Sequence, residues 1–251
     1  MGIAFDTLQA WLLIPKGFEA FLCLYSAYKI RKISQYVVNQ LFSLAFILWA
    51  IYVTIDGFVF TFGAASPSIF NLAKVLFGIQ LAIGAAYAYA IVSVTRVIKD
   101  SQEVFKQYKG KYLEILGLLI VMIIVGATMS LKVVDLETNT MIDPTTLPPP
   151  GEFRIVEVFS LSSALGTVIP FLIFFLSLFY LIKVIIRTED QVIKKKMVIL
   201  TIGVSFAPIG LLYFVLRAFL FPIYTFTTAL VGHIFWILSP LLVLYTQSMK
   251  K

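Results

Sequence analysis

The chain has 251 residues, of which 60% are hydrophobic and 13% are charged, and its formal net charge is +7. Soluble domains carry about 25% charged residues, so this composition excludes an ordinary soluble globular protein. The single cysteine, Cys23, excludes an internal disulfide, and we expect it to pack as a small apolar residue. The basic residues gather at the ends of apolar runs, which favours membrane orientation over nucleic-acid binding.

Continuous apolar runs predict seven transmembrane helices, because a hydrocarbon core of about 30 Å is crossed by about 20 apolar residues. A closed barrel would instead show strands of about 10 residues with alternating polarity. The predicted spans are residues 8–28, 37–60, 69–95, 112–131, 155–182, 197–219 and 226–247. The predicted fold class is therefore an all-α integral membrane protein, with residues 1–251 forming one seven-helix transmembrane domain.

The distribution of basic residues predicts the orientation of this bundle. Fifteen of the twenty Lys and Arg residues fall in alternate loops or at the C-terminus. They are Lys29, Arg31, Lys32, Arg96, Lys99, Lys106, Lys109, Lys111, Lys183, Arg187, Lys194, Lys195, Lys196, Lys250 and Lys251. Cytoplasmic loops carry an excess of Lys and Arg, so we expect the N-terminus outside and the C-terminus inside.

Proline and small residues suggest how the spans pack. Four predicted spans contain a proline, and each is a place where a transmembrane helix can kink. These prolines are Pro15, Pro170, Pro208 and Pro240. The third span contains the run GIQLAIGAAYAYA (78–90), whose small residues allow neighbouring helices to approach closely. We therefore expect the third span to be central in the bundle.

Two loops have a distinctive composition. The inside loop 97–111 spaces its apolar residues at roughly helical intervals, so it either extends the third span as an amphipathic helix or forms a solvated basic turn. The outside segment VVDLETNTMIDPTTLPPPGEFR (133–154) is acidic and ends in three prolines and a glycine, which favour an extended conformation.

Ionisable residues at membrane depth usually face a bundle interior or water, and they are the candidate site residues. Lys16 and Glu19 are three residues apart and so lie on one helical face. With the predicted orientation, all the candidates fall in the outer half of the membrane. They are Lys16, Glu19, Asp56, Lys74, Glu157, Arg217 and His233. We interpret them as an outward-facing polar pocket between helices that holds a small ligand or ion.

Simpler roles remain open for each candidate. Lys74, Glu157 and Arg217 are close enough to an interface to extend to the lipid headgroups. Lys16 and Glu19 could neutralise each other as an ion pair. His233, the only histidine, could be a hydrogen-bonded contact between helices, or it could sense pH or bind a ligand.

Several chemistries do not fit the residues. The last span has no central lysine for a retinal Schiff base, and one histidine with one cysteine cannot build a haem, zinc or iron–sulfur site. No P-loop or dinucleotide fingerprint is present. We therefore expect no catalytic residues, no metal site and no cofactor, and we expect that the protein is not an enzyme.

Three stretches carry a resemblance to a known family. They are SLAFILWAIYVTIDGFVF (43–60), KVLFGIQLAIGAAYAYAIVSVTRVI (74–98) and QVIKKKMVILTIGVSFAPIGLLYFV (191–215). In hydrophobic pattern the chain resembles the seven-transmembrane N-terminal sensor region of prokaryotic histidine kinases. The sequence stops at Lys251 without the linker and kinase of that family. The resemblance thus implies a sensor module that signals through a partner, and no catalytic residue carries over.

Three functions fit the sequence. The first is a non-enzymatic, receptor-like sensor whose basic inside loops contact a cytoplasmic effector or a membrane-protein partner. The second is a small solute transporter like the SWEET sugar carriers, with two three-helix repeats joined by a fourth helix. The third is an accessory subunit of a membrane complex. All three place the chain in a lipid bilayer without nucleic acid, and the lack of glycosylation acceptors and disulfides favours a prokaryotic plasma membrane.

Overall fold

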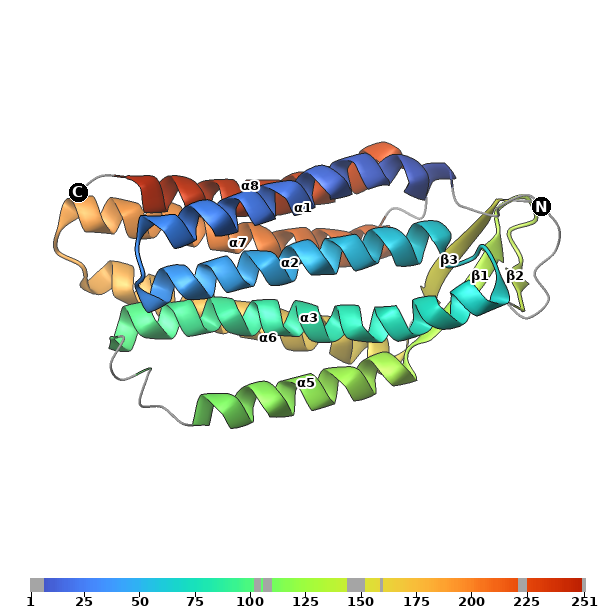
Figure 1. The fold of residues 1–251 in the computed structure, drawn as a ribbon, viewed down its shortest axis with the longest axis horizontal. Coiled ribbons are helices and arrows are strands. Elements are labelled where there is room, and N and C mark those ends of the chain that lie inside the picture. The colour runs from blue at the N-terminus through green and yellow to red at the C-terminus, as the bar shows by residue number, and fades with distance from the viewer. Residues whose placement is uncertain are drawn as a thin grey trace.

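The chain folds into a long helical bundle with a small β-sheet at one end (Figure 1). The structure is a computed structural model that describes residues 7–101, 105, 110–143, 152–158, 160–220 and 225–249. Within these ranges, the side chains of residues 130, 163, 215 and 217–220 are not described.

The described residues contain seven helices and three strands. The helices are α1 (Thr7–Ile33), α2 (Val37–Phe62), α3 (Pro67–Asp100), α5 (Gly110–Thr128), α6 (Leu161–Arg187), α7 (Gln191–Leu220) and α8 (Phe226–Ser248). The strands are β1 (Ser130–Asp135), β2 (Met141–Ile142) and β3 (Phe153–Val158). Successive helices alternate in direction along the bundle, so α1 begins near the sheet and α8 ends at the opposite end (Figure 1).

Six of these helices are long and apolar enough to cross a membrane, and they mark a multi-pass membrane protein in contact with lipid. The remaining helix is α1, which has sufficient length at 27 residues. Its mean hydropathy is lowered by polar side chains in its first half, Gln9, Lys16 and Glu19. A helical span is thus found at each of the seven predicted places, but only six carry the composition of a membrane crossing.

The bundle is closed by contact between its first and last helices. Helix α1 packs against α2 and α8, and α7 packs against α6 and α8. Helix α3 contacts three helices, α2, α5 and α6, as its small residues predict. The largest apolar core lies between α1, α2, α3, α6, α7 and α8, and it includes Phe42, Phe46, Ile91 and Leu181.

The predicted helix boundaries are wrong where the sheet forms. Helix α5 ends at Thr128 rather than at residue 131, and α6 begins at Leu161 rather than at residue 155. The intervening residues pair instead in an antiparallel sheet with strand order β2-β1-β3, in which Val133 lies opposite Ile155. The described parts of the segment 133–154 therefore contribute to a β-sheet, and the three prolines for which an extended conformation was predicted, residues 148–150, lie outside the described residues.

Side-chain alternation explains why these residues form strands. Leu131 and Val133 of β1 and Phe153 and Ile155 of β3 are buried on one face of the sheet. This face covers an apolar cluster at the ends of α2 and α3, which includes Phe77. Burial of every second residue is the period of a strand whose other face meets solvent. The sheet thus seals one end of the bundle.

The turn between β1 and β2 depends on an ionised aspartate. Asp135 Oδ1 accepts hydrogen bonds from the backbone N–H groups of Glu137 at 2.8 Å and Thr138 at 3.4 Å. The hydrogen bond from Glu137, with a smaller contribution from Thr138, lowers the pKa of the Asp135 carboxyl below its ordinary 3.8. The ionised form therefore stabilises the turn fully above pH 3.8, and this stabilisation is lost as the pH falls through the lowered pKa.

We expect the amide resonance of Glu137 to follow the titration of Asp135, with a midpoint below 3.8 in an NMR series in micelles. The Asp135→Asn variant is the control, since its side chain does not titrate. A midpoint at or above 3.8 in the native chain would show that these hydrogen bonds do not hold the carboxylate.

Residues 102–104 and 106–109 are not described, so the two alternatives for the loop 97–111 can be compared only at its two ends. Helix α3 continues through Asp100, beyond the predicted end at residue 95. Ser101 then adopts a positive φ of 86°, which ends the helix.

The close approach of α3 and α5 occurs at two glycines. A Cβ atom added to Gly126 would collide with the Cα atom and the carbonyl group of Gly78, which are backbone atoms that cannot turn away. A Cβ atom added to Gly78 would lie 3.6 Å from the carbonyl carbon of Gly126, an ordinary contact. The two positions therefore form a matched pair. Only position 126 has no space for a side chain, whereas position 78 can accept one.

We expect Gly126→Ala to lower the free energy of unfolding by about 1–3 kcal/mol, the usual cost of overpacking. Gly78→Ala should leave it nearly unchanged. Unfolding in mixed detergent micelles, followed by circular dichroism, measures both variants. Equal destabilisation by the two substitutions would contradict the asymmetric contact.

Candidate functional site: a buried polar cluster

Helix α1 turns its polar side chains toward the bundle. Gln9, Lys16 and Glu19 recur at intervals of seven and three residues, which places them on one helical face. Lys16 is 5% exposed and Glu19 is fully buried. On the other face the exposed side chains are apolar or aromatic, among them Trp11, Ile14, Phe18 and Phe21. The helix is therefore polar inside and apolar outside, the reverse of a helix on a soluble protein.

The first half of the cluster is centred on Lys16. Its Nζ atom lies 2.7 Å from Asp56 Oδ2 and donates a hydrogen bond of 3.2 Å to Gln9 Oε1. Asp56 Oδ1 accepts a hydrogen bond of 2.9 Å from Gln80 Nε2. Both carboxylate oxygens are thus satisfied, as a partly buried charge requires. These contacts connect α1 with α2 and α3.

The second half is centred on Glu19. Its Oε1 atom accepts a hydrogen bond of 2.6 Å from Trp49 Nε1, and its Oε2 atom lies 2.8 Å from His233 Nδ1. These contacts connect α1 with α2 and α8.

Aromatic rings surround the Glu19–His233 pair. The Trp49 ring centroid lies 4.7 Å from that of Tyr87 and 5.1 Å from that of Trp236, and Trp236 lies 5.4 Å from the His233 ring. Trp236 Nε1 donates to the carbonyl of Ala207 on α7. Rings that exclude water lower the local dielectric, so each hydrogen bond inside them is electrostatically stronger than in water.

One polar atom of the cluster lacks a partner. Gln80 is 1% exposed, and its Oε1 atom accepts no hydrogen bond from any described residue. Buried polar atoms are nearly always paired with protein or with ordered water. Besides His233, the titratable side chains that interact electrostatically with Glu19 or close the cluster around it are Cys23, Tyr52, Asp56 and Tyr87.

The structure brings together four of the seven predicted site residues, Lys16, Glu19, Asp56 and His233. The Lys16–Glu19 ion pair considered from their spacing is not formed, since each side chain has a partner on another helix. The four residues meet because each lies on the side of α1, α2 or α8 that faces the interior of the bundle. The role of the cluster in binding stays a prediction.

Two predicted members are exposed. Lys74 is on an exposed face of α3, with its Nζ atom 5.9 Å from the centroid of the Phe70 ring. Glu157 is exposed near the end of β3, although it lies on the same face of the strand as the buried Ile155 and opposite Leu131. Its charge interacts with Tyr52 of α2. The side chain of Arg217 lies outside the described residues.

Sequence reasoning missed Gln9, Gln80, Trp49 and Trp236, which complete the cluster. Gln9 could have been found, because it lies seven residues before Lys16 on the same helical face. No local pattern distinguishes Gln80 from the small residues around it. Among the described residues, no three His, Cys, Asp or Glu side chains are grouped closely enough to hold a metal ion.

A separate polar group fastens α3 to α5 near the opposite end of the bundle. Arg96 Nη1 lies 2.6 Å from Glu114 Oε2, and the Tyr89 hydroxyl donates to the same oxygen at 2.7 Å. Arg96 and Glu114 are partly exposed, Tyr89 is buried, and the arginine and the tyrosine share one carboxylate oxygen, so the group joins the two helices.

Comparison with models of protein families gives no match for the chain, and comparison with curated proteins gives no similar sequence.

Proposed function

We propose that the chain is a non-enzymatic membrane sensor with seven crossings, its N-terminus outside and its C-terminus inside, that signals through a separate partner. The buried polar cluster receives the input. The observation that carries the proposal is the connection of α1, α2, α3 and α8 through Lys16 and Glu19.

The two faces of α1 support a seventh crossing. A helix that exposes Trp11, Ile14, Phe18 and Phe21 to water would leave a large apolar surface unburied, whereas lipid covers such a surface at no cost. The charges on the inner face are paired within the bundle, as charges in membrane helices usually are. Helix α1 also runs beside α8 along the bundle (Figure 1).

The positions of basic residues support the orientation. Arg31 and Lys32 in the last turn of α1, Lys99 in the last turn of α3 and Arg187 at the end of α6 all lie at the end away from the sheet (Figure 1). By the positive-inside rule this end faces the cytoplasm. The β-sheet and the polar half of α1 then face outward, and the basic end is available to a cytoplasmic effector.

The cluster is suited to convert a small input into a change of helix packing. A proton added to the Glu19–His233 pair changes the charge that holds α1 against α8, and a hydrogen-bond donor at Gln80 Oε1 changes the contact between α2 and α3. A ligand shifts a conformational equilibrium only by its differential affinity for the two states. Removing or adding a charge in a dry aromatic enclosure supplies such a difference.

The proposal is tested by measuring the distance between α1 and α8 in liposomes. Spin labels are placed at Arg31→Cys and Ser248→Cys, which are exposed at the same end, in a background with Cys23→Ala. The external pH is varied from about 5 to about 8, the interval in which histidine changes charge. We expect the distance distribution in the native cluster to change with external pH, and the distributions with Glu19→Gln or His233→Gln to stay constant.

The same liposomes separate a sensor from a transporter. A fluorescent pH indicator and a panel of labelled solutes inside the vesicles report flux. Flux of a proton or solute that depends on Glu19 would favour the transporter alternative and overturn the sensor. If the distance distribution between α1 and α8 changes neither with external pH nor with any solute of the panel, the cluster does not receive the signal and the proposal is overturned. Copurification in mild detergent would then test the accessory-subunit alternative.

A further inference from the structure

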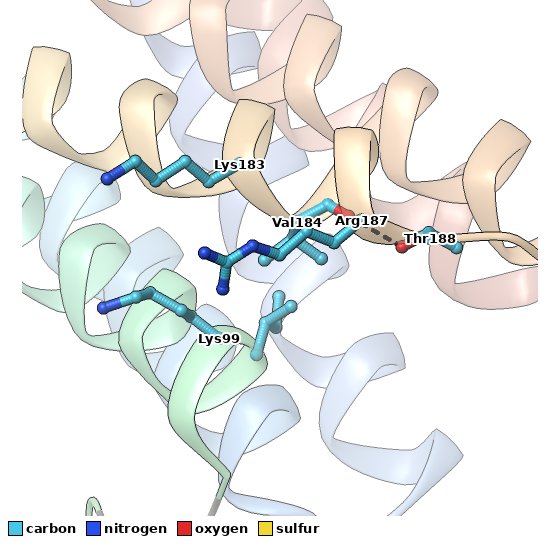
Figure 2. Close-up of a pocket in the computed structure, with 6 residues that line it drawn as sticks. Lys99, Lys183, Val184, Arg187 and Thr188 are labelled. Carbon is cyan, nitrogen blue, oxygen red and sulfur yellow. Dashed lines mark hydrogen bonds between the residues drawn. The ribbon is translucent and has the colours of Figure 1, made fainter.

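A small pocket lies between the C-terminal ends of α3 and α6, and its lining includes no residue of the buried polar cluster (Figure 2). Its volume is about 150 Å³. Its lining consists of Ile98 and Lys99 from α3, Lys183, Val184 and Arg187 from α6, and Thr188 just after α6. Figure 2 shows the Lys99, Lys183 and Arg187 side chains extending to the same side of the pocket. Three cationic groups from two helices thus converge on one small space.

Aromatic rings hold the two lysines in place. Lys99 Nζ lies 4.8 Å from the centroid of the Tyr180 ring, and Lys183 Nζ lies 4.2 Å from that of the Phe179 ring. Both rings belong to α6, so the same helix that supplies Arg187 also positions both ammonium groups. A cation over a ring face is attracted by the ring quadrupole, by about 0.5–1 kcal/mol at an exposed site. These contacts favour side-chain positions at the pocket for both lysines.

The charges of the pocket are not balanced within the described residues. Asp100 is the carboxylate paired there, with Oδ1 3.3 Å from Lys99 Nζ, and no described acidic side chain pairs with Lys183 or Arg187. The C-terminal ends of α3 and α6 add about half a negative charge each. Three cations against one carboxylate and two helix ends leave roughly one positive charge, so the pocket suits an anion with a single negative charge.

The surroundings of the pocket are apolar on the side of α6. Ile98 and Val184 form part of its wall, and Phe179, Ile182 and Ile186 are exposed on the neighbouring surface of the helix. Ile186 is 73% exposed one residue before Arg187. Basic pockets between transmembrane helices on the cytoplasmic side are suited to lipid headgroups, and an adjacent apolar helix surface suits acyl chains. A free anion would need only the first of these features.

We propose that the pocket binds the phosphate group of an anionic phospholipid, with Lys99, Lys183 and Arg187 as donors and the apolar face of α6 in contact with the acyl chains. The lipid holds the ends of α3 and α6 together at the level of the headgroups. A guanidinium gives two parallel hydrogen bonds to phosphate, and the lysines contribute charge around it.

Binding is measured on the purified full chain in neutral detergent, with short-chain phosphatidylglycerol, short-chain phosphatidylcholine and inorganic phosphate as separate probes. We expect phosphatidylglycerol to bind, phosphatidylcholine to bind more weakly by about tenfold or more, and inorganic phosphate not to compete. The variant Lys183→Gln/Arg187→Gln should lower the affinity for phosphatidylglycerol by about tenfold for each charge-assisted hydrogen bond that is lost.

Two further variants serve as controls. Lys194→Gln/Lys195→Gln removes the same charge from the start of α7, from residues that do not line the pocket, and should leave the affinity unchanged. Asp100→Asn removes the one opposing carboxylate and should strengthen binding, a gain that a misfolded protein cannot produce. Equal loss of affinity in the two double variants, unchanged affinity in Lys183→Gln/Arg187→Gln, or weaker binding in Asp100→Asn would each overturn the proposal. Competition by inorganic phosphate at the affinity of the lipid would assign the pocket to free phosphate instead.

Discussion

Replacing Glu19 by alanine is expected to lower the free energy of unfolding by about 3 kcal/mol or more, the cost of removing one member of a buried polar pair. The substitution leaves Trp49 Nε1 buried without its acceptor and His233 Nδ1 buried without its hydrogen-bond partner. It also detaches α1 from α2 and α8 at the same point. Unfolding in mixed micelles at increasing denaturing-detergent fraction, followed by circular dichroism, measures the loss.

Two controls separate the hydrogen bonds from the loss of a carboxylate as such. Glu19→Gln retains an acceptor oxygen for Trp49, so we expect it to be less destabilising than Glu19→Ala. Glu189→Ala removes an exposed carboxylate between α6 and α7 and should change the stability little. A Glu19→Ala variant as stable as the Glu189→Ala variant would contradict the hydrogen bonds described for this carboxylate.

Removing only Asp56 from the Lys16–Asp56 ion pair is expected to have the second largest effect. It should lower the free energy of unfolding by about 3 kcal/mol. Asp56→Leu leaves the Lys16 ammonium buried, with Gln9 as its remaining partner in the cluster. The same micelle unfolding assay applies. The expected order of stability is native, then Lys16→Met/Asp56→Leu, then Asp56→Leu.

The double variant Lys16→Met/Asp56→Leu should recover more than half of that loss, because apolar residues often replace a buried ion pair at little cost. Gln80 Nε2 still loses its acceptor in this variant, so recovery is not complete. A double variant no more stable than Asp56→Leu would show that the ion pair is not what couples the two positions. Both measurements are independent of whether the cluster senses anything.

The helices could be predicted from the sequence because their apolar runs are continuous over the length of a membrane crossing. The inward polar face of α1 could be anticipated in part, since Lys16 and Glu19 lie three residues apart. Their partners could not, because the spacing of residues within one helix carries no information about which helix packs beside it. The contact of Glu19 with His233 depends on the closure of α1 against α8.

The sheet was missed for a different reason. Strand β1 follows directly on the apolar run of α5, and β3 leads through a short connection into that of α6, so the predicted helices extended over both. The signal was the alternation of apolar Phe153 and Ile155 with polar Arg154 between them, a short period of two beside otherwise helical surroundings. Placing Glu157 in a helix was a consequence of that error in period.

The contact between Glu19 and His233 spans 214 residues of sequence, and this separation affects how the chain is made. The first helix leaves the ribosome with an unpaired carboxylate and ammonium on one face, and charged residues near the centre of a helix oppose insertion into lipid. Helix α8, which supplies the histidine, is synthesised after all the other described helices. A stable position for α1 thus depends on a segment made much later, and a chain truncated before Phe226 should leave α1 accessible to added protease in a membrane-insertion assay.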